Sequence, residues 1–301
     1  MSITSDIMKL KKEKNAVILA HYYVDEDVQE VADYVGDSFY LSKVATKVDQ
    51  DIIVFAGVEF MGESAKILNP GKKVLMPEPG ADCPMAHMAT KEEILKLREQ
   101  YDDLAVVCYI NSTAELKTYS DVCVTSSNAV KIVKNLPNKN IFFIPDRNLG
   151  SFVAKQVPEK NIILNNGFCP RHVAITKDMV IEAKKNHPDA KFAAHPECTA
   201  DVLELADYIG STSGIIDYVV DTDCDEFIIG TVDGVFGEIK KKAPDKKLYT
   251  LKPDQVCVNM KMVTLDKVLE VLEEEKNEVY VEEELARKAM KPLTRMLELA
   301  K

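Results

Sequence analysis

Residues 15–38 read NAVILAHYYVDEDVQEVADYVGDS and carry the pattern from which the fold can be predicted. The apolar run at 15–20 has the length and composition of a buried strand, and it ends at a polar residue, His21. A helix is expected over Asp27–Tyr34, followed by a short link to a second helix that opens at Ser38.

The same pattern occurs twice more, at 104–126 (LAVVCYINSTAELKTYSDVCVTS) and at 190–212 (AKFAAHPECTADVLELADYIGST). In each copy 12 residues lead from the polar strand-end residue to an aspartate, and 5 more lead to a hydroxyl residue. A cysteine follows the hydroxyl residue after 45 residues in the first copy, 43 in the second and 45 in the third. A period of about 87 residues predicts three similar units around a pseudo-threefold axis. The equivalent positions are His21, Tyr109 and His195; Asp33, Asp121 and Asp207; Ser38, Ser126 and Thr212; and Cys83, Cys169 and Cys257.

The remaining elements of each unit follow the same alternation. Second strands are expected at Asp51–Phe55, Asn140–Ile144 and Glu226–Ile229, loops around Gly62, Gly150 and Gly237, and third strands at Lys73–Met76, Asn161–Leu164 and Lys247–Thr250. The helices that correspond to 27–34 are expected over 114–120 and 201–208. Alternating strands and helices predict the α/β class with small parallel sheets.

We therefore predict three pseudo-threefold-related αβα sandwich domains around a central cavity. The repeats are expected at residues 1–100, 101–189 and 190–263, with a C-terminal helical cap at 264–301.

Composition limits the functions that the chain can have. The net charge of −11 disfavours nucleic acid and anionic membranes as partners. No apolar run approaches the ~20 residues that a membrane helix needs, and no signal peptide is recognised. Seven cysteines without a signal peptide are typical of free thiols in the cytoplasm rather than of a disulfide framework.

One cysteine from each unit is expected at the centre, because parallel strands bind ligands beyond their carboxyl ends. Three thiolates, from Cys83, Cys169 and Cys257, could hold a metal ion or an iron–sulfur cluster. Three cysteines are one short of the four corners of a cubane cluster, so one iron would stay open and act as a Lewis acid. Cys108 is expected in the core, Cys224 at the surface, and Cys123 and Cys198 near the cavity but without equivalents in the other units.

The hydroxyl residues Ser38, Ser126 and Thr212 are each expected to open a helix. Serine and threonine are common helix N-caps, which would give them a purely structural role. Three helix N-termini that point at one cavity could also bind phosphate or carboxylate groups, and the threefold arrangement favours this second interpretation.

Acid–base groups are also expected at the central cavity. Tyr23, Tyr109 and Glu197 lie at strand ends, and His172 and His195 could bind substrate or carry protons. His87 is a weaker candidate and His187 is expected at the surface. Each of these side chains alone is more often structural, and their shared repeat positions favour function.

Taken together, these motifs resemble the quinolinate synthase family, and the resemblance covers nearly the whole chain. The matching runs are Ala20-His-Tyr-Tyr, Ala32-Asp-Tyr-Val-Gly-Asp-Ser, Asp82-Cys-Pro-Met-Ala, Tyr109-Ile-Asn, Gly167-Phe-Cys-Pro-x-His, His195-Pro-Glu-Cys and Gly210-Ser-Thr-Ser-Gly. The resemblance implies an oxygen-sensitive [4Fe-4S] cluster. It also implies condensation of iminoaspartate with dihydroxyacetone phosphate to quinolinate, phosphate and two waters, in NAD biosynthesis. A transient encounter with the enzyme that makes iminoaspartate is a further expectation.

The resemblance also implies roles for individual residues. Cys83, Cys169 and Cys257 would ligate three irons, and Tyr23, Tyr109, Glu197 and His172 would handle proton transfers. The substrate pocket would be lined by His21, Ser38, Tyr109, Asn111, Ser126, His195, Glu197 and Thr212.

Two other functions remain open at this point. An aconitase-type iron–sulfur hydro-lyase would share the open iron without needing a ketose phosphate. A non-catalytic iron–sulfur or zinc sensor would need neither the acid–base groups nor the helix termini.

Overall fold

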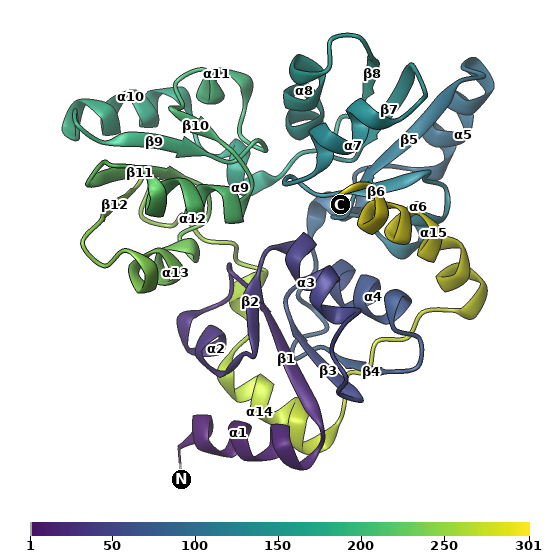
Figure 1. The fold of residues 1–301 in the computed structure, drawn as a ribbon, viewed down its shortest axis with the longest axis vertical. Coiled ribbons are helices and arrows are strands. Elements are labelled where there is room, and N and C mark those ends of the chain that lie inside the picture. The colour runs from purple at the N-terminus through teal and green to yellow at the C-terminus, as the bar shows by residue number, and fades with distance from the viewer. Residues whose placement is uncertain (1) are drawn as a thin grey trace.

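The computed structural model describes residues 2–301, so the first residue of the predicted first unit lies outside it. Three small sheets of four strands each surround a common centre (Figure 1). The strands are β1 (Ala16–His21), β2 (Tyr34–Gly36), β3 (Ile52–Ala56), β4 (Lys73–Leu75), β5 (Leu104–Tyr109), β6 (Val122–Val124), β7 (Asn140–Ile144), β8 (Asn161–Leu164), β9 (Lys191–Ala194), β10 (Tyr208–Ile209), β11 (Glu226–Gly230) and β12 (Lys247–Thr250).

The three sheets share one topology. Their strand orders are β2-β1-β3-β4, β6-β5-β7-β8 and β10-β9-β11-β12, and every pairing between neighbouring strands is parallel. Parallel neighbours need crossover connections, which the helices supply. The predicted α/β class and the three small parallel sheets are confirmed.

The helices lie between the strands in chain order. They are α1 (Ile3–Glu13), α2 (Glu26–Val31), α3 (Ser38–Ala45), α4 (Glu59–Leu68), α5 (Lys91–Gln100), α6 (Ala114–Thr118), α7 (Ala129–Asn135), α8 (Arg147–Gln156), α9 (Pro170–Val173), α10 (Lys177–Asn186), α11 (Ala200–Leu203), α12 (Thr212–Asp221), α13 (Val235–Lys242), α14 (Leu265–Glu274) and α15 (Glu283–Leu299), with 3-10 turns η1 (Pro84–His87) and η2 (Met260–Met262).

Each unit has a fourth strand that the sequence did not predict. The helices expected over 27–34, 114–120 and 201–208 end early, and the chain continues into the short edge strands β2, β6 and β10. The repeated aspartate causes this, because its carboxylate accepts a hydrogen bond from a backbone N–H of the first strand. The pairs are Asp33 with Ile18 (2.8 Å), Asp121 with Val106 (2.7 Å) and Asp207 with Phe192 (2.8 Å).

The same three aspartates bind a basic side chain from the helix that precedes each sheet. The ion pairs are Lys11–Asp33 (2.9 Å), Arg98–Asp121 (2.9 Å) and Lys184–Asp207 (3.1 Å). The aspartate of the repeat is therefore a structural residue that joins a helix, a central strand and an edge strand. The predicted residue boundaries of the units stay predictions.

The loops expected around Gly62, Gly150 and Gly237 are wrong, because all three glycines lie inside helices, in α4, α8 and α13. In α4 and α8 a Cβ at the glycine would crowd a neighbouring side chain, whereas at Gly237 the nearest atom is 3.1 Å away, in the side chain of Glu26. A Cβ at Gly62 would meet Met76, and a Cβ at Gly150 would lie 2.6 Å from Leu164. Glycine here allows close packing and is not a sign of a turn.

Gly234 lies at another close contact, between the third and the first unit. A Cβ there would collide with the backbone carbonyl of Tyr22 and lie 2.8 Å from the Cα of Tyr23. We expect Gly234→Ala to lower the free energy of unfolding by about 1–3 kcal/mol, because backbone atoms cannot move aside as a flexible side chain can. Urea denaturation measures the change. Gly71→Ala is the control, since nothing lies within 4 Å of its Cβ, and an equal loss in both variants would contradict the prediction.

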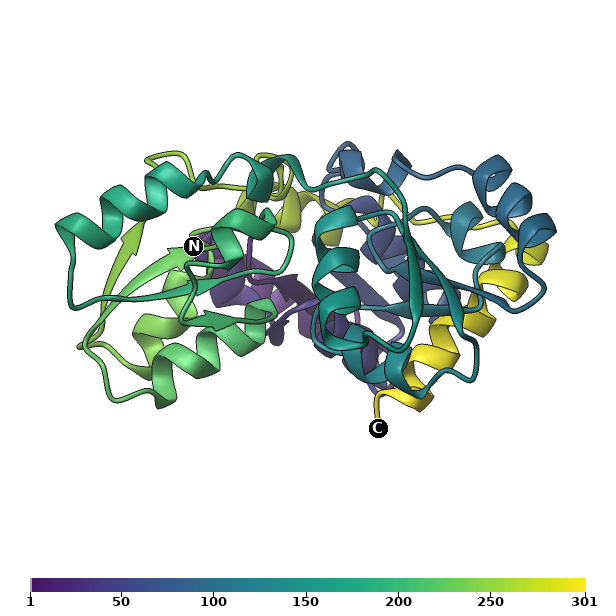
Figure 2. The ribbon, with the colours of Figure 1, turned by 90° about the horizontal axis from the view of Figure 1, so that it is seen from above.

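The last two helices extend along the outside of the assembly. α14 packs on α1 and β3 of the first unit, and α15 lies against α6, β6 and α4, so that it joins the second unit to the first (Figure 1). Seen from above, α15 runs along the outer side of the second unit, away from the third (Figure 2). Among the helices of residues 2–301, none combines the length and the apolar character needed to cross a membrane.

Candidate active site

A central cavity lies where the carboxyl ends of β1, β5 and β9 converge. It encloses about 860 Å³ of space free of protein atoms, part of it open to solvent. Every predicted site residue lines it, although these residues come from three units. They are His21, Tyr23, Ser38, Cys83, Tyr109, Asn111, Ser126, Cys169, His172, His195, Glu197, Thr212 and Cys257.

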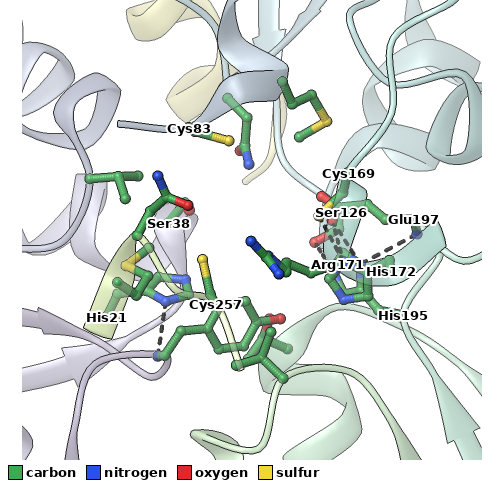
Figure 3. Close-up of a pocket in the computed structure, with 18 of the residues that line it drawn as sticks. His21, Ser38, Cys83, Ser126, Cys169, Arg171, His172, His195, Glu197 and Cys257 are labelled. Carbon is green, nitrogen blue, oxygen red and sulfur yellow. Dashed lines mark hydrogen bonds and ion pairs between the residues drawn. The ribbon is translucent and has the colours of Figure 1, made fainter. Parts of the chain in front are cut away.

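The three repeat cysteines each lie next to a short helical turn at the cavity wall. Cys83 and Cys169 are the N-cap residues of η1 and α9, and the following Pro84 and Pro170 open those turns. The carbonyl of Cys257 accepts a hydrogen bond from the N–H of Lys261 (3.0 Å) in η2. The sulfur atoms of the labelled cysteines surround the cavity in Figure 3.

Burial controls the charge of these thiols. It raises the pKa of Cys83 to about 12, and it also raises the pKa values of Cys169 and Cys257. Without a metal ion the three sulfurs hold their protons, and a metal ion that binds them must release those protons.

The other four cysteines do not line the cavity. Cys108 is fully buried as predicted, and it faces the buried Cys123 across the β5–β6 pairing. Cys198 is buried as well. Cys224 is half-buried rather than exposed, since its Sγ lies 3.4 Å from the carbonyl of Glu226.

Glu197 is the centre of a buried hydrogen-bond network. One carboxylate oxygen accepts from the hydroxyl of Tyr109 (2.6 Å), and the other lies 2.7 Å from Nδ1 of His172. His172 also contacts the thiol of Cys169, with 3.2 Å between Nδ1 and Sγ. The network therefore connects an acid–base group directly to one of the three thiols (Figure 3).

The charge states of this network follow from its partners. Burial opposes ionisation of Glu197, but His195, His172 and the hydrogen bonds from His172 and Tyr109 hold the pKa of the carboxyl below its usual value. Burial raises the pKa values of Tyr23 and Tyr109, so both phenols keep their protons and can donate. Burial lowers the pKa of His195 to about 3, which makes its imidazole neutral.

The hydroxyl residues are not helix caps, contrary to the structural alternative considered above. The caps are the preceding residues Asp37 and Ser211, so Ser38 and Thr212 are the first residues of α3 and α12. Ser126 lies on a turn three residues before α7, and its hydroxyl contacts Nε2 of His195 (3.2 Å). Two helices, not three, therefore begin at the cavity with one of these hydroxyl residues.

Two further polar groups at the cavity are suited to an anionic or polar ligand. Within residues 2–301, the buried Oδ1 of Asn111 has no hydrogen-bond partner. Arg171, which the sequence analysis did not single out, projects into the cavity in Figure 3. Its position two residues after Cys169 is a signal that could have revealed it. Comparison of the repeats did not, because the residues two positions after the other two cysteines are Met85 and Asn259, which carry no charge.

The remaining histidine candidates lie elsewhere. His87 is exposed and pairs with Asp82 (2.7 Å), and neither residue lines the cavity. His187 stacks on Tyr249 with 3.5 Å between the ring centroids, so it is half-buried.

One set of side chains is close enough to ligate a single metal ion. The ligand atoms of Cys169, His172 and Glu197 lie within 4.8 Å of one another. Of the three repeat cysteines, only Cys169 belongs to this set.

This geometry defines a class of protein: an α/β enzyme of three similar units, with thiols, acid–base groups and hydroxyls in one central cavity. Comparisons with known proteins agree with it. The family model described as "Quinolinate synthetase A protein" matches residues 5–298. The quinolinate synthase of Fusobacterium nucleatum subsp. nucleatum is 58% identical over 294 residues, which cover 98% of each chain. That of Caldicellulosiruptor saccharolyticus is 54% identical over 298 residues, 99% of this chain and 98% of the other. The chain belongs to the quinolinate synthase family.

Proposed function

We propose that this enzyme condenses iminoaspartate with dihydroxyacetone phosphate to form quinolinate, phosphate and two waters, in NAD biosynthesis. The observation that carries the proposal is the meeting of one cysteine from each unit with the Tyr109–Glu197–His172 network in a single cavity. Both substrates are small, and small-molecule sites typically combine apolar walls, here with Phe60 and Met61, and a few polar groups that fix the orientation of the ligand.

We further propose a [4Fe-4S] cluster held by Cys83, Cys169 and Cys257. The donor set fits such a group, because three half-buried thiols border one cavity and no other cysteine does so within residues 2–301. Bound there, the cluster would offer one iron without a protein ligand as a Lewis acid for a hydroxyl or carboxylate group. Free thiols favour a reducing compartment, and we place the enzyme in the cytoplasm.

The side chains of the cavity divide into two groups in this proposal. His21, Ser38, Asn111, Ser126, His195 and Thr212 bind and orient the substrates, and Tyr23, Tyr109, Glu197 and His172 move protons. Loss of water requires a proton donor at the leaving oxygen, which a neutral phenol can be. A base is needed at the carbon or nitrogen that loses a proton, and a buried carboxylate–imidazole pair suits this role.

The test is metal analysis followed by an activity assay on protein purified without oxygen. About four irons and four sulfides per chain, together with quinolinate formation from the two substrates, would support the proposal. A complete cluster that dehydrates hydroxy-acids but makes no quinolinate would indicate the hydro-lyase. Zinc without sulfide would favour a single ion at Cys169, His172 and Glu197, and it would contradict the cluster.

Arg171 supplies the positive charge that the two anionic substrates need. Among the lining residues of the described chain 2–301, it is the single lysine or arginine, whereas Asp37 and Glu197 are acidic. A hydrogen bond to a charged group contributes about 1.5–3 kcal/mol, so we expect Arg171→Gln to raise KM about 10–100-fold for at least one substrate. Steady-state kinetics with each substrate varied in turn measures the change.

The matched control is Arg147→Gln, which removes the same charge outside the cavity. The Arg147 guanidinium stacks on Phe168 at 4.9 Å and donates to Asn166 (3.0 Å). Unchanged KM values in Arg171→Gln, or an equal rise in both variants, would refute this role. The iron content of both variants is measured to separate substrate binding from cluster assembly.

A further inference from the structure

Asp146 is a buried carboxyl group to which the proposed function gives no role. It is the N-cap residue of α8, it is 0% exposed, and it does not line the central cavity. One carboxyl oxygen accepts the backbone N–H of Leu149 (2.7 Å), which caps the helix. The other oxygen accepts the backbone N–H of Cys169 (3.1 Å). A single side chain therefore joins the start of α8 to one of the three cavity cysteines.

The backbone around Asp146 holds the same loop. Asp146 forms an isolated parallel bridge with Gly167, and the N–H of Arg147 donates to the carbonyl of Gly167 (2.8 Å). The chain that follows β8 is thus attached to the start of α8 at two points, through the backbone at Gly167 and through a side chain at Cys169. Cys169 is the N-cap residue of α9, which also carries His172.

The repeat shows that this aspartate does not belong to the framework that the three units share. Asp146 follows the strand-end residue Tyr109 by 37 residues, and the same interval from the strand-end histidines of the other units leads to Val58 and Val232. Val58 is the N-cap residue of α4 and makes no side-chain cap, so a helix can begin at this position without one. A buried carboxyl group is costly unless it is hydrogen-bonded. The contact with Cys169 therefore accounts for the aspartate better than the cap does.

Cys83 offers a comparison within the same chain. Its backbone N–H is also accepted by a carboxylate, at 2.6 Å, but that carboxylate belongs to the preceding residue Asp82, whose side chain is 35% exposed. A contact between neighbours in sequence moves with the loop that contains both. Asp146 precedes Cys169 by 23 residues and lies in another element, so its contact fixes the loop against the sheet.

We propose that Asp146 is a positioning residue that holds Cys169 in place as a cluster ligand, by anchoring its backbone to the start of α8. This rests on the proposed [4Fe-4S] cluster. Without the contact the N–H of Cys169 loses its acceptor, and α9 can shift relative to the other two units. The three sulfurs would then converge less well, and the bound cluster would be lost more easily.

The experiment uses Asp146→Asn on holoenzyme handled without oxygen. The amide oxygen still caps Leu149, because asparagine is a good N-cap, but the amide nitrogen then faces the N–H of Cys169, a donor against a donor. We expect iron to pass to a chelator about 10–100-fold faster than from the wild type, the range that outer partners of metal ligands contribute. Asp146→Ser also caps the helix and is too short to reach Cys169, so it replaces the asparagine variant if the latter fails to fold.

Two matched aspartates serve as controls, and both variants should lose iron at a rate close to that of the wild type. Asp121→Asn, in the same unit, weakens a buried contact to the N–H of Val106 (2.7 Å) away from the cysteines. Asp82→Asn alters the exposed contact at Cys83. A wild-type rate in Asp146→Asn would overturn the proposal. Equal acceleration in Asp121→Asn would do so as well, since it would indicate general loosening, and so would equal acceleration in Asp82→Asn, since it would indicate an effect of charge alone.

A second readout does not depend on the cluster. Nitrogen-15 NMR of cysteine-labelled full-length chain without iron follows the backbone N–H of Cys169, which Cys169→Ala identifies. We expect this resonance to shift and its hydrogen to exchange faster with solvent in Asp146→Asn, and to stay unchanged in Asp121→Asn. An unmoved resonance would contradict the anchoring role. If the wild type assembles no cluster, the proposed function fails, and the NMR measurement still decides whether Asp146 holds Cys169.

Discussion

Replacing Cys83, Cys169 or Cys257 by alanine is expected to abolish cluster assembly and, with it, quinolinate formation. Each cysteine comes from a different unit, and each borders the same cavity. Removal of one thiolate would leave two irons of a cubane without a protein ligand, and the binding free energy that three thiolates provide together would be lost. Iron and sulfide analysis of protein reconstituted without oxygen measures the result directly.

The control is Cys224→Ala, which removes a half-buried thiol outside the cavity and should leave the iron content unchanged. The pattern across the variants also separates two kinds of metal site. A single ion held by Cys169, His172 and Glu197 would be lost only from Cys169→Ala, because Cys83 and Cys257 are not part of that set. Equal behaviour of all four cysteine variants would contradict both kinds of site.

The features that could be predicted from the sequence are those that the three units share. Strand-end polar residues, hydroxyl residues and cysteines recur at nearly constant spacing, and the parallel sheets bring their carboxyl ends to one place. The central cavity and its lining could therefore be inferred without a structure. The role of the repeated aspartate could not, because its partner is a backbone N–H of the first strand, as with Asp33 and Ile18.

The sequence analysis missed two kinds of feature: very short elements, and side chains that occur in only one unit. The edge strands β2, β6 and β10 have two or three residues, too few for a hydrophobic period to show. Gly62 inside α4 was mistaken for a loop residue because the approach of Met76 is a tertiary contact. Arg171 has no counterpart of the same kind in the other units, so comparison of the repeats could not detect it.

Glu197→Gln is expected to lower kcat by about 100–10,000-fold, the usual contribution of a general acid–base group. The carboxylate accepts from Tyr109 at 2.6 Å and from His172 at 2.7 Å, and both donors are buried. A glutamine of the same shape has one accepting oxygen and one donating nitrogen, so one of the two donors would face another donor. The negative charge that would stabilise a protonated His172 ring would also be lost.

The matched control for this change is Glu63→Gln, because the Glu63 carboxylate accepts the backbone N–H of Ala114 (2.9 Å) and lies outside the cavity. Activity is measured together with iron content, because the two proposals for the metal differ here. With a cluster held by three cysteines, Glu197→Gln keeps its iron and loses its rate, whereas a single ion at Cys169, His172 and Glu197 would lose the metal as well. Full activity in Glu197→Gln would show that the buried carboxylate only holds Tyr109 and His172 in place, and that the proton transfers must be assigned to other side chains of the cavity.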